Sequence, residues 1–159
     1  GLPTVVEERI ETHHNFAAIE KVRGRSAVVH RKGAVRYTEN DGRGVGNITP
    51  VLVTIPGSMQ TGSYIARGKV ETSSYVRSMG TCAHGAGRRL GRNETRRQNV
   101  GVDIRAEIET QDIVLVCPPE SDALDEAGRA YKDIEGVMAY QSDLVEPIVK
   151  LRPLGVVKG

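Results

Sequence analysis

The segment from Cys82 to Arg92 joins one histidine to a turn of small residues and to three arginines. A neutral imidazole can attack a phosphorus atom and so divide one difficult transfer into two easier steps. Glycines beside it let backbone amides approach an anion closely, because no side chain intervenes. Arginine forks match the geometry of phosphate oxygens. The segment therefore predicts a nucleotide-phosphate site with His84 at the reacting atom, although the same residue types also occur in ordinary turns flanked by solvated charge.

Charge is unevenly distributed along the sequence, although the formal net charge is only +2. Residues 77–105 are mostly basic, whereas residues 107–146 are mostly acidic. A localised basic segment on a near-neutral protein indicates that a polyanion binds at one face of the molecule. For Arg96 and Arg97, a solvated helix face is the alternative interpretation.

Length and composition are those of one soluble, globular domain. The chain has 159 residues, of which 38% are hydrophobic and 26% are charged. No apolar stretch reaches the roughly 18 residues of a membrane-spanning helix, so no membrane partner is expected. Two distant cysteines, Cys82 and Cys117, favour reduced thiols and a cytoplasmic location. The first residues lack an initiator methionine and a signal-peptide pattern, so we expect the chain to begin inside a longer product or after processing.

Short apolar runs bounded by turn residues predict strands, and apolar residues at helical spacing predict helices later in the chain. Strands are expected at residues 27–29, 50–55, 63–66, 113–116 and 148–157. Helices are expected at residues 93–110, despite Gly101, and within residues 124–144, and a flexible loop at residues 38–47. Strands before helices indicate an α+β fold, in which a mixed β-sheet is flanked by helices.

Further short segments occur in the same order as in one protein family: residues 30–34, 55–59 with 63–64, and 152–159. Together with the segment around His84, they make the chain resemble the C-terminal portion of RtcB, a family of GTP-dependent RNA-splicing ligases. The resemblance runs from about Thr12 to the last residue. It implies that residues 1–159 are a single domain or fragment of an RtcB-like fold, with the catalytic histidine motif at residues 82–92.

The resemblance implies RNA ligation through a guanylylated histidine. His84 would take GMP from GTP and pass it to an RNA 3'-phosphate, and a 5'-hydroxyl would then displace it. Ends with a 2',3'-cyclic phosphate are implied as well, and the RNA partner would be tRNA halves or broken RNA. The implied nucleotide contacts are Ser58, Ser63, His84, Gly85, Ala86, Gly87, Tyr131 and Lys158. Phosphate handling would fall to Arg88 and Arg92.

Several of these residues also have a purely structural interpretation. Tyr131 lies at helical spacing, where a tyrosine usually belongs to the core, and Lys158 lies near a terminus, where a lysine is usually solvated. The compact basic cluster of the sequence consists of His30, Arg31 and Lys32. It could contact RNA phosphates, or it could simply be the exposed end of a strand.

The resemblance implies Mn²⁺ as the metal, with His14 as a ligand, because His14 directly precedes Asn15. Adjacent histidines on a strand point to opposite faces, so at most one of this pair is expected in a given site. Without the resemblance, such a histidine is more often a surface or core residue. The resemblance implies that the remaining ligands, a cysteine, an aspartate and further histidines, lie in a portion before Gly1, on the same polypeptide or on a separate chain. Cys82 is a candidate ligand or helper thiol, or else a small buried residue.

A few residues depart from the family pattern and indicate a divergent member. Gly91 replaces a common serine, Val35 a threonine and Gln60 a glycine. The alternative function is a non-catalytic RNA-binding or accessory module that keeps the phosphate-binding motif. A third interpretation is a nucleotide-binding domain in which His84 is structural.

Overall fold

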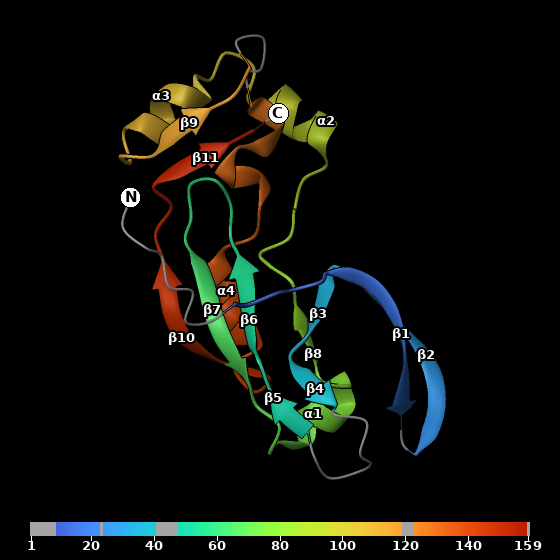
Figure 1. The fold of residues 1–159 in the computed structure, drawn as a ribbon. Helices are drawn as coiled ribbons and strands as arrows, with labels where there is room; N and C mark the ends of the chain where they lie inside the picture. Colours follow the sequence, from blue (N-terminus) through green and yellow to red (C-terminus); the bar gives the residue numbers. More distant parts are fainter. Residues whose placement is uncertain (1–8, 23, 41–47, 119–122, 159) are drawn as a thin grey trace.

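The computed structural model describes residues 9–22, 24–40, 48–118 and 123–158. Figure 1 shows a larger, strand-rich part and a smaller part that contains α2, α3, β9 and β11. The fold is a mixed α/β arrangement of short strands and short helices. In the part of the chain that the structure describes, no helix has the length and the apolar character needed to cross a membrane.

The strands pair in several small sheets, in place of the single mixed sheet that the sequence predicts. One sheet has three antiparallel strands, β6 (Leu52–Pro56), β7 (Ser63–Gly68) and β10 (Val145–Leu151), with β7 in the middle. The described residues add four pairs: β1 (Asn15–Val22) with β2 (Arg25–Lys32), β3 (Ala34–Arg36) with β8 (Thr81–Ala83), β4 (Thr38–Asn40) with β5 (Ile48–Pro50), and β9 (Val114–Val116) with β11 (Gly155–Val157). The β9–β11 pair is parallel and the others are antiparallel. Three of these four pairs consist of three-residue strands, which are shorter than usual, whereas β1 and β2 have eight residues each and still pair only with each other among the described residues.

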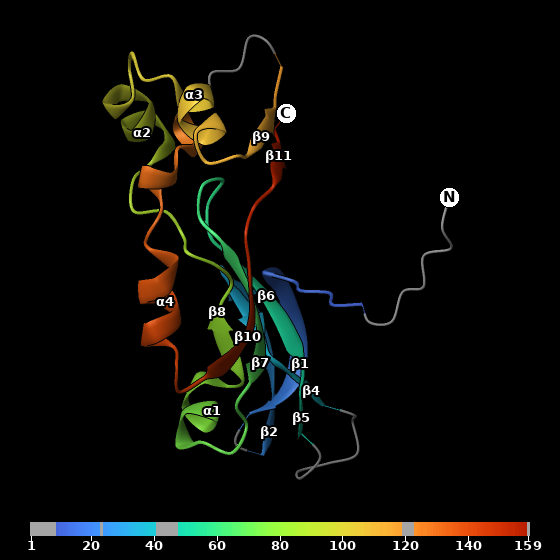
Figure 2. The same ribbon diagram turned by 90° about the vertical axis from the view of Figure 1, so that its left-hand side faces the viewer.

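The larger core lies among the three-stranded sheet, the β3–β8 pair and α4 (Ile134–Tyr140). Alternation along β6 turns Val53 and Ile55 inward, as expected for a strand with one buried face. Asp133 caps α4, because its carboxylate accepts from two amides in the first turn. Figure 2 shows α4 running alongside β8 and β10. This core fixes β8, the strand that leads into the histidine motif.

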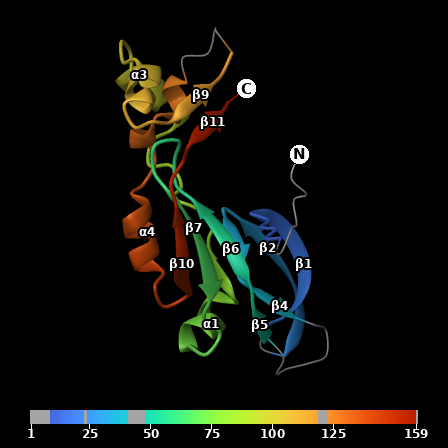
Figure 3. The same cartoon turned by 60° about the vertical axis from the view of Figure 1, so that its left-hand side comes forward.

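A second core lies in the smaller part of the molecule. Ile104 and Ile108 of α3 (Ile104–Glu109) pack with Leu115 of β9 and with Met59. Met59 belongs to the turn between β6 and β7, and Figures 1 and 3 show this turn reaching toward β11. The β6–β7 turn therefore connects the two parts of the molecule.

The prediction of one helix over residues 93–110 is wrong. The chain forms α2 (Arg92–Gln98), breaks, and then forms α3. Gly101 lies in the break with φ +80°, a conformation that glycine adopts at little cost. Asp103 starts α3 by accepting from the amide of Ala106 at 3.0 Å. The apolar residues keep their helical spacing across the break. The helix itself ends at α2, and Asp103 begins a new one.

The helical region predicted over residues 124–144 is confirmed in its second half, as α4. Its first half forms two 3₁₀ turns, η1 (Leu124–Glu126) and η2 (Gly128–Ala130). The amide of Gly128 donates to Gln60 Oε1 at 2.8 Å, and a Cβ at Gly128 would lie 2.6 Å from that oxygen. A larger residue at position 128 would therefore displace the Gln60 side chain that joins these turns to the β6–β7 turn.

The predicted strands are found, with different limits. Residues 27–29, 63–66 and 113–116 fall largely within β2, β7 and β9, whereas residues 50–55 begin at the end of β5 and continue into β6. The predicted tail divides into β10 and β11. The predicted loop at residues 38–47 starts as β4, and its residues 41–47 lie outside the described residues.

Candidate functional site

His84 follows directly after β8, which is anchored on both sides. Val35 of β3 pairs with Cys82 of β8, and both side chains are buried. The amide of Ala83 donates to Oε1 of the buried Gln141 at 2.9 Å. His84 therefore leaves the core from a fixed point and is itself partly exposed.

The imidazole ring of His84 stacks on that of His14. The ring centroids are 5.3 Å apart and the ring planes meet at 24°. Gly33 joins the two backbones: its amide donates to the carbonyl of His14 at 2.9 Å, and its carbonyl accepts from the amide of His84 at 3.4 Å. Gly33 does so with φ +67°, in the left-handed region that favours glycine. The structure thus brings the predicted nucleophile and the predicted metal ligand together from distant parts of the sequence.

The bend after His84 packs against the end of β6. The amide of Ala86 donates to the carbonyl of Pro56 at 2.9 Å, and a Cβ at Gly85 would lie 2.6 Å from the same oxygen. Gly87 has φ +66°, and its carbonyl accepts from the amide of Lys132 at 2.9 Å. Backbone packing therefore explains why these residues are small. The Ala86 amide is used within the chain, so it is not a donor for an anion in this conformation.

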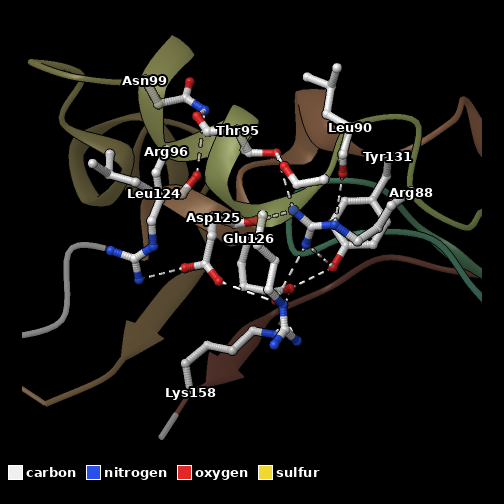
Figure 4. Close-up of polar contacts among 12 residues, drawn as sticks. Arg88, Leu90, Thr95, Arg96, Asn99, Leu124, Asp125, Glu126, Tyr131 and Lys158 are labelled. Atoms are coloured by element: carbon white, nitrogen blue, oxygen red, sulfur yellow. Dashed lines mark hydrogen bonds and ion pairs between the residues drawn. The ribbon is translucent and has the colours of Figure 1, made fainter.

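Acceptors from three segments surround Arg88 (Figure 4). Its guanidinium donates to the carbonyl of Asp125 at 2.5 Å, to Thr95 Oγ1 at 3.1 Å and to the carbonyl of Leu90 at 3.1 Å. Its guanidinium carbon also lies 5.1 Å from the ring centroid of Tyr131, within range of a cation–π contact. Arg88 thus joins the histidine motif to the η1 turn and α2, and its predicted contact with phosphate stays a prediction.

Glu126 is the acidic centre of the same cluster (Figure 4). Its Oε2 accepts from the Tyr131 hydroxyl at 2.5 Å and lies 3.3 Å from Lys158 Nζ. Its Oε1 lies 3.5 Å from an Arg88 nitrogen and 3.7 Å from an Arg92 nitrogen. Two residues that the resemblance assigns to the nucleotide, and two that it assigns to phosphates, therefore meet at one carboxylate.

Burial and charge set the ionisation of this cluster. Burial alone would raise the pKa of Glu126, but the Tyr131 hydrogen bond and the charges of Lys158 and Arg88 hold that pKa below its ordinary value. Burial and the bond to Glu126 raise the pKa of Tyr131. Glu126 is therefore ionised near neutral pH. The Tyr131 hydroxyl stays protonated and donates a hydrogen bond to this carboxylate.

Sequence reasoning missed Glu126. In the sequence it is one member of an acidic run, and no local pattern separates it from its neighbours. Its partners lie in the histidine motif, at η2 and near the C-terminus, so only the folded chain identifies it. A partial signal was its position five residues before Tyr131, once that tyrosine had been assigned to the nucleotide.

The two predicted serines have different surroundings. Ser58 closes the β6–β7 turn: its amide donates to Thr61 Oγ1 at 2.7 Å, and its hydroxyl accepts from the amides of Gln60 and Thr61. A Cβ at Gly128 would lie 3.2 Å from Ser58 Oγ, so this serine lies beside the turns that carry Glu126. Ser63 begins β7 and pairs with both neighbouring strands of the sheet.

The predicted basic cluster is divided between the two faces of β2. His30 and Lys32 are exposed, whereas Arg31 is only 3% exposed. Arg31 donates to both carboxylate oxygens of Glu20, at 2.6 and 2.9 Å, and to Thr81 Oγ1 at 2.9 Å. Alternation along the strand turns Arg31 inward, and this burial argues against the predicted contact of Arg31 with RNA. The RNA contact stays a prediction for His30 and Lys32.

Cys82 has the structural role of a buried side chain. Its side chain belongs to the larger core, and burial raises the pKa of its thiol to about 12. A thiol must lose its proton to bind a metal or to act as a nucleophile, so this environment disfavours both functions. Cys82 is a free thiol, as the sequence predicts.

Comparison with known proteins supports the family resemblance that the order of the motifs indicates. The profile of the family described as "tRNA-splicing ligase RtcB" matches residues 3–159. The chain belongs to the RtcB family.

Three RtcB relatives illustrate the extent of the similarity. The RNA-splicing ligase RtcB of Escherichia coli K12 is 38% identical over 157 residues, which cover 98% of this chain and 34% of the relative. The tRNA-splicing ligase RtcB of Methanopyrus kandleri is 38% identical over 97% of this chain and 17% of its own length. The RNA-splicing ligase RtcB of Mycobacterium bovis is 36% identical over 94% of this chain and 36% of its own length. The chain therefore spans about a third or less of these RtcB proteins.

The donor groups of this RtcB chain do not by themselves complete a metal site. Among the described residues, no three His, Cys, Asp or Glu side chains gather as they would around an ion. Mn²⁺ favours carboxylate and other oxygen ligands, and imidazole can be combined with them. The stack of His14 on His84 supplies imidazole alone. One hollow of about 670 Å³ lies elsewhere, beside β5 and β6, and none of its lining residues is a predicted site residue.

Proposed function

We propose that this chain carries the guanylate-accepting part of a GTP-dependent RNA ligase. The enzyme would join RNA 3'-phosphate or 2',3'-cyclic phosphate ends to 5'-hydroxyl ends. One observation carries the proposal: His84 leaves an anchored strand partly exposed, with its ring stacked on His14 at 5.3 Å. Membership of the RtcB family supports it.

The proposed chemistry proceeds through three displacements at phosphorus. A ring nitrogen of His84 attacks the α-phosphorus of GTP, a nitrogen–phosphorus bond forms, and pyrophosphate leaves. Where the RNA ends in a 2',3'-cyclic phosphate, water would first attack its phosphorus and release the 2'-oxygen as a hydroxyl. An oxygen of the RNA 3'-phosphate then attacks the same phosphorus of the His84 adduct and releases the imidazole. Finally, the 5'-hydroxyl oxygen attacks the RNA phosphate, its proton is lost, and GMP leaves as the strands are joined.

The remaining residues would bind the two substrates. The nucleotide would contact Ser58, Ser63, Gly85, Ala86, Gly87, Tyr131 and Lys158. Arg88 and Arg92 would handle phosphate groups, and His30 and Lys32 would face RNA. Mn²⁺ is the proposed metal, with His14 as one ligand. Because the described residues do not complete its coordination, no step above depends on it.

The decisive experiment is labelling of the complete polypeptide that carries this sequence with GTP labelled at the α-phosphate, in the presence of Mn²⁺. We expect a covalent, acid-labile adduct in the wild type and none in His84→Asn, because asparagine has no nucleophilic ring nitrogen. Loss of a covalent nucleophile lowers turnover by about 10⁴-fold or more. His13→Asn is the matched control, since this neighbouring histidine lies outside the stack, and it should be labelled like the wild type.

A chimaera removes the effect of chain length from this experiment. In it, the chain replaces the matching third of the E. coli relative. If neither the complete polypeptide nor the folded chimaera is labelled, the ligase proposal is refuted. Salt-sensitive RNA binding that persists in His84→Asn, without labelling of the wild type, would instead support the accessory RNA-binding module.

A further inference from the structure

Glu126 divides its two carboxylate oxygens between two sets of residues. Oε2 contacts Tyr131 and Lys158, the pair proposed to hold the base, at 2.5 and 3.3 Å. Oε1 faces Arg88 and Arg92, the pair proposed to handle phosphates, at 3.5 and 3.7 Å. The side chains of Glu126 and Arg88 are 17% and 23% exposed, whereas Arg92 is 71% exposed, so Arg92 meets the carboxylate at the solvent edge of the cluster.

The backbone of Lys158 is held in place at the end of β11. Lys158 follows β11, and its amide donates to the carbonyl of Val116 at 2.8 Å. β11 in turn lies in register beside β9. With its backbone fixed, the flexible side chain is directed by the carboxylate at its end. An ammonium has three donors, so one bond to Glu126 leaves donors for an acceptor on a base.

Tyr131 is fixed by the same carboxylate. Its backbone pairs with Arg88 in an isolated bridge, and the Arg88 guanidinium lies over its ring. The bond from its hydroxyl to Glu126 then sets the rotation of the side chain. Tyr131 and Lys158 therefore share one anchor although they come from separate segments.

We propose that Glu126 is a positioning residue that sets base selectivity by fixing Tyr131 and Lys158. An ammonium donates and cannot accept, so it favours a base with a carbonyl oxygen at this point and disfavours one with an amino group. Guanine carries that oxygen, whereas adenine and 2,6-diaminopurine carry an amino group in its place. The inference rests on the proposed function, because it assigns Tyr131 and Lys158 to the base.

The test compares GTP with 2,6-diaminopurine riboside triphosphate as donors for labelling of His84 in the complete polypeptide. The two nucleotides differ at the 6-substituent that Lys158 would recognise, a carbonyl oxygen or an amino group, and at the neighbouring N1, which carries a proton only in guanine. In Glu126→Gln we expect kcat/KM for GTP to fall about 10- to 100-fold, with a change of about threefold or less for the analogue. The preference for GTP should therefore shrink at least about threefold. A role in folding alone would lower both values equally.

Two further variants sharpen this comparison. Asp125→Asn removes the adjacent carboxylate, whose ion pairs are with Arg92 and Arg96, and it should keep the wild-type preference. Lys158→Met should lose the preference, and adding Glu126→Gln to it should change the ratio little further, because coupled residues are not additive. If Glu126→Gln does not fold, Tyr131→Phe breaks one arm of the same anchor and should reduce the preference in part.

The two proposals fail in different ways. No label on the wild type from either nucleotide refutes the proposed function, and equilibrium binding of the two nucleotides then still reports the base preference. A labelled wild type whose preference is unchanged in a folded Glu126→Gln, or in Tyr131→Phe where that variant replaces it, refutes the inference alone. An equal loss for both nucleotides refutes it as well, because it shows a structural effect.

Discussion

The cluster around Glu126 and the stack of His14 on His84 are organised by different forces. In the cluster, a carboxylate, two arginines, a lysine and a tyrosine hydroxyl satisfy one another within this chain. In the stack, Gly33 places two rings face to face through backbone bonds. Charged groups removed from water need partners, whereas imidazole rings can pack without an ion pair. The chain therefore assembles a charged anchor by itself, whereas the described residues position the proposed nucleophile without gathering around it the groups that would stabilise charge at phosphorus.

This contrast separates two requirements of phosphoryl transfer. A nucleophile must be held in place, and negative charge on the phosphate oxygens must be stabilised as it develops. For the proposed nucleophile His84, the stack meets the first requirement. The positive charge that could meet the second requirement lies in the cluster. There Arg88 already pairs with Glu126, and Arg92 pairs with both Glu126 and Asp125. A bound phosphate would have to compete with these carboxylates for the arginines.

The largest effect in this comparison is expected at His14. His14→Phe keeps a ring that can stack on His84 and removes the nitrogens that can bind a metal. If His14 is a ligand, we expect the Mn²⁺ concentration for half-maximal labelling of His84 to rise about 10- to 100-fold, the range for loss of a group that supports a metal site. Titration of the labelling rate with Mn²⁺ measures it. His13→Phe is the control, and an unaltered Mn²⁺ requirement in His14→Phe would leave His14 with a stacking role only.

The next effect concerns the stability of the cluster. Arg88→Lys keeps the charge but cannot reproduce the planar fork that reaches Asp125, Thr95 and Leu90. We expect the free energy of unfolding to fall by about 2 kcal/mol, less than for a fully buried ion pair because the side chain is 23% exposed. Urea denaturation monitored by circular dichroism measures the change.

Arg97→Lys provides the comparison for Arg88→Lys. Arg97 pairs with Glu94 on the exposed side of α2, with 75% of its side chain accessible. Surface pairs of this kind contribute about 0–1 kcal/mol, so the variant should remain within about 0.5 kcal/mol of the wild type. If both variants lose the same free energy of unfolding, the acceptors around Arg88 stabilise the fold no more than water would.

The sequence predicts those features of the fold that depend on neighbouring residues. Strand runs such as residues 63–66 were recognisable from apolar composition and flanking turn residues, and β7 confirms this one. The apolar spacing over residues 93–110 persists although Gly101 interrupts the helix, so periodicity alone did not locate the break. Division into small sheets depends on pairing between distant strands, and no local pattern specifies it.

The candidate site shows the same limit. The motif around His84 was visible from residue types, and the resemblance added Tyr131 and Lys158. The carboxylate that joins these two, Glu126, was not visible, because its partners come from separate segments. The residues next to Arg31 in the sequence also did not predict that its side chain is buried. Its guanidinium donates to the carboxylate of Glu20, which lies on the opposite strand of the hairpin.

The smallest predicted effect is the pH dependence of the cluster. The pKa of Glu126 is lower in the folded chain than its ordinary value of 4.5, so the folded state favours the ionised carboxylate. Its contribution to stability is therefore complete above pH 4.5 and is lost as the pH falls through the lowered pKa. We expect Glu126→Gln to be about 1–2 kcal/mol less stable than the wild type at pH 7, the scale of hydrogen bonds to a charged group.

This difference in unfolding free energy should narrow as the pH is lowered from 4.5 toward 3, because protons compete increasingly for the Glu126 carboxylate, first in the unfolded chain and then in the folded one. Urea denaturation of both proteins across this range measures it. His14→Asn is the control from the other region: it removes no carboxylate, so its difference from the wild type should not narrow over the same range. A Glu126→Gln difference that stays constant down to pH 3 would mean that the bonds of Glu126 do not depend on its charge, and the contrast between a charged anchor and an uncharged stack would then be lost.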